Sequence, residues 1–83
     1  MDRHLIEQRV RLEVAKVLDV VPEIGGAEPL TLQGLDSLRS VELTLSLEDN
    51  FAIVFDDEDI SFENFTSIDS IVELLDAKLD HRV

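Results

Sequence analysis

The sequence predicts an all-α fold, a bundle of three main helices and one short helix with a long loop between the first two main helices. Only three Gly and two Pro interrupt the chain, too few for the many turns of an all-β fold. Apolar residues recur every three or four positions in three long segments. Because 83 residues leave room for one small hydrophobic core, we expect a single domain over residues 1–83.

The first helix is expected to run from Asp2 to about Val21, where Pro22 interrupts the pattern. Its apolar residues share one face: Ile6, Val10, Val14, Val17 and Val21. The connection that follows, residues 22–36, holds all three Gly and both Pro, so it is expected to be irregular. Its apolar side chains are expected to cover part of the core: Ile24, Leu30 and Leu32.

The second helix carries two apolar lines instead of one. Asp36 is expected to cap it by accepting backbone N–H groups, which places Ser37 in the first turn with its hydroxyl facing solvent. At about 100° per residue, one line consists of Leu43, Leu47 and Phe51, and the other, roughly opposite, of Leu38, Val41 and Leu45. The line with the aromatic residue is expected to face the core, because charged residues border the other line. An exposed apolar strip with a charged rim is typical of a docking surface.

The acidic stretch after the second helix is expected to contain one short helix, from Asp57 to Phe62. A final helix is expected to begin after a cap at Thr66 or Ser67 and to end near KLDHRV, residues 78–83. Its apolar residues form a single stripe: Ile68, Ile71, Val72, Leu75 and Leu79.

Charge and composition exclude several function classes. The 19 Asp and Glu against seven Lys and Arg give a net charge of −12, so neither nucleic acid nor an anionic membrane surface is an expected partner. No signal sequence is expected from the first residues and no apolar run reaches about 20 residues, so a cytoplasmic location is expected. Without Cys it has no disulfide, thiolate metal site or cysteine nucleophile. We also expect a monomer.

Ser37 lies in a pattern with more features than a capping serine needs. An Asp-Ser pair alone usually marks only a helix start. Here Gly34 precedes the pair, a leucine flanks it on each side, and the run LDSLRSVELTLSLEDNF continues from residue 35 to the aromatic residue 51. This run resembles the modification site and second helix of acyl carrier and peptidyl carrier proteins. The segments IEQRVRLEVAKVLDV, FDDEDI and FTSIDSIVELL resemble the same family, so the resemblance extends over nearly the whole chain.

The resemblance implies a carrier protein and not an enzyme. Ser37 would carry 4′-phosphopantetheine, transferred from coenzyme A by a phosphopantetheinyl transferase, and the thiol of that arm would hold an acyl or aminoacyl group as a thioester. Asp36 would contribute to recognition by the transferase. The other implied partners are an adenylation or acyl-loading enzyme and a downstream synthase, transferase or tailoring enzyme. The residues implied to dock on partners are Leu38, Arg39, Val41, Glu42, Leu45, Glu48 and Asp49.

Several functions stay open. The ENFTSI run, residues 63–68, is similar to stand-alone carriers of polyketide or nonribosomal-peptide secondary metabolism, whereas fatty-acid synthesis and D-alanine transfer are alternatives. Arg39 departs from the acid that is common in fatty-acid carriers, which weakens that alternative. An unmodified acidic interaction or inhibitor module is the alternative from another class, and it would need neither Ser37 nor the exposed strip.

The remaining candidate sites have simpler interpretations. The DDED run, residues 56–59, lacks the ligand spacing and central glycine of an EF-hand loop, so no metal site is expected. His4 and His81 lie near the chain ends and are expected to be exposed and non-catalytic. The side chains expected to line the interior, and so to decide whether a cargo is sequestered, are Thr44, Leu47, Phe62, Phe65 and Ile71.

Overall fold

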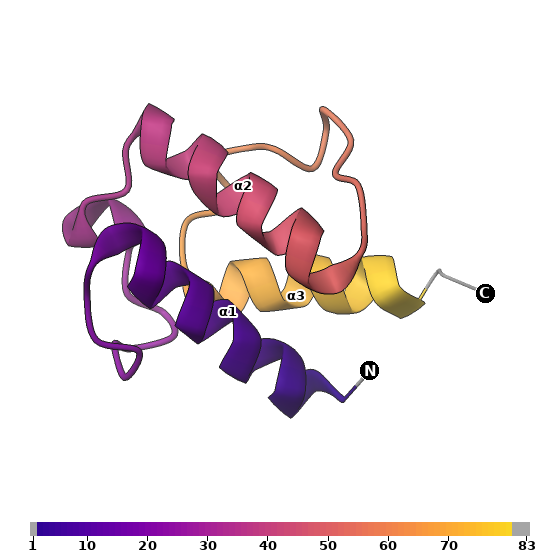
Figure 1. Cartoon of the computed structure of the whole chain (residues 1–83), viewed down its shortest axis with the longest axis horizontal. Coiled ribbons are helices and arrows are strands. Elements are labelled where there is room, and N and C mark those ends of the chain that lie inside the picture. Colours follow the sequence, from indigo (N-terminus) through magenta and orange to yellow (C-terminus); the bar gives the residue numbers. More distant parts are fainter. Residues whose placement is uncertain (1, 81–83) are drawn as a thin grey trace.

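The computed structural model describes residues 2–80, and in that range it contains three α-helices and one short 3₁₀ helix (Figure 1). The elements are α1 (Arg3–Leu18), η1 (Leu30–Gln33), α2 (Ser37–Phe51) and α3 (Ile68–Asp80). No strand forms between residues 2 and 80, so the predicted all-α fold is confirmed. α1 packs against both α2 and α3, so it takes part in both of these helix–helix interfaces of the core.

An aspartate caps each end of α1. The His4 N–H donates to the Asp2 carboxylate at 3.2 Å, which caps the first turn. At the other end Asp19 adopts the left-handed conformation, with φ of 57°, and its N–H donates to the Ala15 carbonyl. The helix therefore ends earlier than the predicted end near Val21, whose side chain is 64% exposed.

The two apolar lines predicted for α2 are confirmed. The buried line has exposures of 0% for Leu43, 0% for Leu47 and 4% for Phe51. The opposite line has exposures of 67% for Leu38, 56% for Val41 and 59% for Leu45. One helix thus contributes apolar side chains both to the core and to the surface.

The long connection between α1 and α2 is packed against the start of α3. The Asp69 N–H donates to the Gly26 carbonyl at 2.9 Å, and a β-carbon at Gly26 would collide with the Asp69 carboxylate. Leu30 is fully buried and Ile24 is partly buried, as predicted. The prediction for Leu32 is wrong, because its side chain is 75% exposed. Successive residues of a 3₁₀ helix are turned by about 120°, so Leu32 points away from the core that Leu30 faces.

The predicted short helix from Asp57 to Phe62 is wrong, because this stretch forms turns. The N–H groups of Asp59 and Ile60 both donate to the Asp56 carbonyl, at 2.9 and 3.3 Å, but the Ser61 N–H then donates to the Asp59 carbonyl and the helical ladder stops. Aspartate is a poor helix former and adjacent acidic side chains repel each other, which favours turns here.

α3 begins at one of the two predicted caps. The Ser67 hydroxyl accepts the Ser70 N–H at 3.2 Å. The predicted apolar stripe is confirmed, with Ile68, Ile71, Val72 and Leu75 buried and Leu79 partly buried against the core. The rings of Phe55 and Phe65 meet edge to face beside this stripe, with centroids 5.7 Å apart.

Candidate functional site

The start of α2 presents the Ser37 hydroxyl to solvent. Asp36 has an extended backbone, and its carboxylate accepts the Arg39 N–H at 2.8 Å, which caps the helix as predicted. The Asp36 carbonyl accepts the Ser40 N–H at 2.8 Å. Ser37 follows as the first helical residue, with an exposed side chain. Its hydroxyl therefore lies where the positive end of the helix dipole favours an anion.

Gly34 turns the chain just before this helix. Its φ is 103°, and its N–H donates to the Thr31 carbonyl at 3.3 Å, which closes η1. A β-carbon at this position would meet no atom within 4 Å. The left-handed backbone, and not crowding, is therefore what selects glycine here.

A cavity of about 420 Å³ opens beside Ser37. The end of the long connection and the first turns of α2 form one side of it, and residues 60–65 form the other. Its lining consists of Thr31, Leu35, Asp36, Ser37, Ser40, Thr44, Ile60, Ser61, Phe62 and Phe65. An adjoining cavity of about 350 Å³ shares Ser37, Ser40, Thr44 and Ile60 with it and reaches Val41, Leu45 and Glu48. The serine thus lies where an open cavity meets the exposed strip of α2.

The interior prediction for Phe62 is wrong. The other four side chains in that prediction are buried, but Phe62 is 71% exposed and forms the outer wall of the cavity. Phe65, three positions later in the same turns, takes the core position against Phe55. Among residues 2–80, neither a histidine nor a lysine lines the cavity beside Ser37.

Two of the predicted docking residues, Arg39 and Glu48, are half-buried and make hydrogen bonds within the fold. The Arg39 guanidinium donates to the Val17 carbonyl at 2.5 Å, which ties α2 to the end of α1. The Glu48 carboxylate accepts the Phe55 N–H at 2.7 Å, which ties α2 to the segment that follows it. The other predicted docking residues have exposed side chains: Leu38, Val41, Glu42, Leu45 and Asp49.

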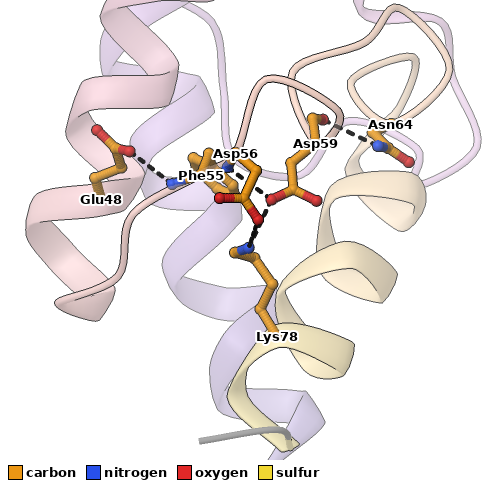
Figure 2. A network of polar contacts seen from close by, with 6 residues as sticks. All are labelled: Glu48, Phe55, Asp56, Asp59, Asn64 and Lys78. Carbon is orange, nitrogen blue, oxygen red and sulfur yellow. Dashed lines mark hydrogen bonds and ion pairs between the residues drawn. The ribbon is translucent and has the colours of Figure 1, made fainter.

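A polar network around Lys78 was not predicted from the sequence (Figure 2). The Lys78 ammonium lies 2.5 Å from the Asp59 carboxylate and 3.9 Å from that of Asp56, and the Asn64 amide donates to the Asp59 carbonyl at 2.9 Å. The hydrogen bond from Lys78 holds the pKa of Asp59 below its usual range, and the Asp56 N–H acts in the same direction. One feature of the sequence could have indicated this network: Arg39 and Lys78 are the only basic residues between residues 36 and 80, where acids are numerous.

A second unpredicted contact joins α1 to α2. Glu13 is only 7% exposed, and its carboxylate accepts a hydrogen bond from the Ser46 hydroxyl. The Lys16 ammonium lies 3.7 Å from the same carboxylate oxygen. Burial of this acid is tolerated because both groups compensate its lost hydration.

Metal-ligating side chains do not cluster within residues 2–80. No group of three or more His, Cys, Asp or Glu in this range could hold a metal ion. His4 is exposed on α1, 3.2 Å from the Gln8 side-chain nitrogen, and His81 lies outside the described residues. None of the helices in this part of the chain has the length and apolarity to cross a membrane.

Comparison with known proteins identifies the family. A family model described as a phosphopantetheine attachment site matches residues 8–75, which include Ser37 and all residues that line the two cavities. A chain of the crystal structure of Bradyrhizobium japonicum glycine:[carrier protein] ligase complexed with glycylated carrier protein has the same fold, with a TM-score of 0.77 at 21% identity. The match covers 84% of this chain and 97% of that chain, so the two are similar in length. The chain therefore belongs to the family of phosphopantetheine attachment domains, which are carriers of 4′-phosphopantetheine and not catalysts.

Proposed function

We propose that the chain carries an acyl or aminoacyl group as a thioester on a 4′-phosphopantetheine arm attached to Ser37. The observation that supports this most is the exposed Ser37 hydroxyl at the start of α2, beside a cavity of about 420 Å³. The arm would supply the thiol for the thioester, and the chain has no Cys of its own.

The other five serines are less suited to modification. Ser40 is half-buried. The remaining hydroxyls make hydrogen bonds inside the fold: Ser46 with Glu13, Ser61 with the Asn64 N–H, and Ser67 with Ser70. The Ser37 hydroxyl has no hydrogen-bond partner among residues 2–80, so a transferase would break no internal contact when it modifies this residue.

The surroundings of Ser37 fit a phosphate ester. The first turn of α2 offers backbone N–H groups and the positive end of the helix dipole to an anion. Asp36 is the acid nearest in sequence, and one of its carboxylate oxygens is already bound to the Arg39 N–H at 2.8 Å. In this proposal Asp36 also serves recognition by the phosphopantetheinyl transferase.

α2 provides the docking surface for partner enzymes in this proposal. The exposed strip Leu38, Val41 and Leu45 supplies apolar contact area. Glu42 and Asp49, with exposed side chains at the rim, steer the encounter with basic partners. Arg39 and Glu48 add charge from fixed positions, because their side chains are bound within the fold.

The proposed partners are an adenylation or acyl-loading enzyme and a downstream synthase, transferase or tailoring enzyme of a polyketide or nonribosomal-peptide pathway. The ENFTSI run and the cation at Arg39 support this pathway class over fatty-acid synthesis. The fold likeness to a chain from the complex of a glycine ligase with a glycylated carrier protein supports aminoacyl loading. A discrete aminoacyl ligase is therefore the first loading enzyme to test.

Intact mass spectrometry tests the attachment. Wild type, Ser37→Ala and the control Ser40→Ala are incubated with coenzyme A, Mg²⁺ and a broad-specificity phosphopantetheinyl transferase, after circular dichroism has shown that all three are folded. Wild type and Ser40→Ala are expected to gain one phosphopantetheine, and Ser37→Ala none. A folded wild type that gains nothing would contradict the proposal and favour the unmodified acidic interaction module.

A further inference from the structure

We infer that Lys78 is a positioning residue, which fixes the wall of the cavity beside Ser37 and thereby sets how well a cargo on the arm is sheltered from solvent. The wall is the segment of residues 56–65, which Lys78 holds through Asp59. The effect on cargo rests on the proposed function, whereas the effect on the wall is a property of the chain alone.

The wall consists of turns, and Phe65 is the one residue of the segment that is buried in the core. Ile60, Ser61, Phe62 and Phe65 line the cavity, and all four lie in turns and bends between α2 and α3. The Phe65 N–H donates to the carbonyls of Ser61 and Phe62, both at 3.2 Å, so these bonds are internal to the segment. Internal turn bonds fix the shape of the segment but not its distance from α2. That distance depends on contacts to the helices.

Asp59 makes the polar contacts that join the segment to α3 (Figure 2). Its carboxylate accepts the Asp56 N–H at 2.8 Å and the Lys78 ammonium at 2.5 Å, and its carbonyl accepts the Asn64 amide at 2.9 Å. One residue therefore connects both halves of the segment to α3. Displacement of Asp59 would move Ile60, the next residue, which lines both cavities.

Lys78 provides the charge that this arrangement requires. Four consecutive acids, residues 56–59, repel each other, and Lys78 is the only Lys or Arg of residues 2–80 that forms an ion pair with them. Its side chain is 21% exposed and its ammonium lies 5.9 Å from the centre of the Phe55 ring, so the pair is partly shielded from water. The lowered pKa of Asp59 agrees with a strong contact.

The second attachment of the segment is independent of Lys78. The Glu48 carboxylate on α2 accepts the Phe55 N–H at 2.7 Å, just before the segment begins, and the Phe65 ring at the end of the segment packs against the Phe55 ring. α3 itself is held by buried residues such as Ile71 and Leu75, which do not contact solvent. Loss of the Lys78 charge is therefore expected to release the wall without unfolding the bundle.

Hydrogen exchange of the unmodified protein tests the wall. Lys78→Met removes the charge, Lys78→Arg keeps it, and Arg9→Met removes one positive charge from an exposed side chain on α1. Exchange at the Asp59, Ile60 and Phe65 amides is expected to rise about fivefold or more in Lys78→Met only. The amides of α1 and α3 are expected to exchange as in wild type. Asp59→Asn serves as a second variant if Lys78→Met does not fold, with the same expected direction.

The cargo readout is the cleavage of a thioester by hydroxylamine. Octanoyl- and acetyl-phosphopantetheine are installed from the corresponding coenzyme A thioesters. The ratio of the octanoyl cleavage rate to the acetyl cleavage rate is then compared among the variants. The ratio is expected to rise in Lys78→Met and to be restored in Lys78→Arg. Unchanged exchange in the wall, exchange that rises equally in α1 and α3, or an unchanged ratio would each overturn the inference. Failure of the attachment proposal is seen separately, as a wild type that takes up no phosphopantetheine.

Discussion

Two leucines on α2, two positions apart, are expected to respond very differently to truncation. Leu43 is fully buried, so Leu43→Ala loses the transfer free energy of the side chain and leaves a cavity, about 3 kcal/mol in total. Leu45 is 59% exposed, so Leu45→Ala loses less than half of the roughly 2 kcal/mol for burying a leucine. The helix-propensity change is the same at both mid-helix positions and cancels in the comparison.

The expected difference in the free energy of unfolding between the two variants is about 2 kcal/mol, or about 8 to 16 °C in Tm for a domain of this size. Urea unfolding followed by circular dichroism measures it, because the chain has no Trp or Tyr for fluorescence. Leu45→Ala is also expected to slow loading by a partner enzyme while the fold is retained. Equal destabilisation of the two variants would refute the assignment of one apolar line to the core and the other to the surface.

Three further changes test the local contacts. Ala52→Gly is expected to raise the free energy of unfolding by about 0.5 to 1 kcal/mol, because Ala52 ends α2 with φ of 52°; a urea midpoint below wild type would contradict this. Asp36→Ala is expected to cost about 1 kcal/mol through the lost cap, with Asp36→Ser as the control that keeps most of it, and thermal melts compare the two. The Asp59 pKa is lowered from 3.8, so the stabilisation from Lys78 is present above that pH and lost as the pH falls through the lower folded-state pKa. The Tm values of wild type and Lys78→Met should therefore differ near pH 7 and converge in strong acid, and a difference independent of pH would exclude this pair as its source.

Much of the fold follows from local sequence patterns. The spacing of apolar residues defines the faces of a helix, so the two lines of α2 and the single stripe of α3 were predictable. The cap at Asp36 was predictable for the same reason, because a cap is a contact between residues close in sequence. Ser37 at the first turn follows directly from that cap.

The predictions were wrong or incomplete where tertiary contacts or backbone dihedrals determine the end of a helix or the exposure of a side chain. The left-handed conformation of Asp19 ends α1 before Pro22 is reached, and no spacing rule reports a dihedral. Phe62 is exposed in a turn of a segment that Lys78 on α3 contacts through Asp59, and this contact joins residues far apart in sequence. The contacts of Arg39 with Val17 and of Lys78 with Asp59 join distant parts of the chain, so local periodicity carries no signal for them.

The position of the phosphopantetheine on the modified protein tests the central proposal most directly. Trypsin cleaves after Lys16, Arg39 and Lys78, so the peptide 17–39 contains Ser37 as its only serine, and the peptide 40–78 contains the other five. Peptide mapping by mass spectrometry is expected to find the added group on the peptide 17–39, with fragment ions that assign it to Ser37 and not to Thr31. The group on the peptide 40–78, or on Thr31, would contradict the assignment of the attachment site to Ser37 at the start of α2.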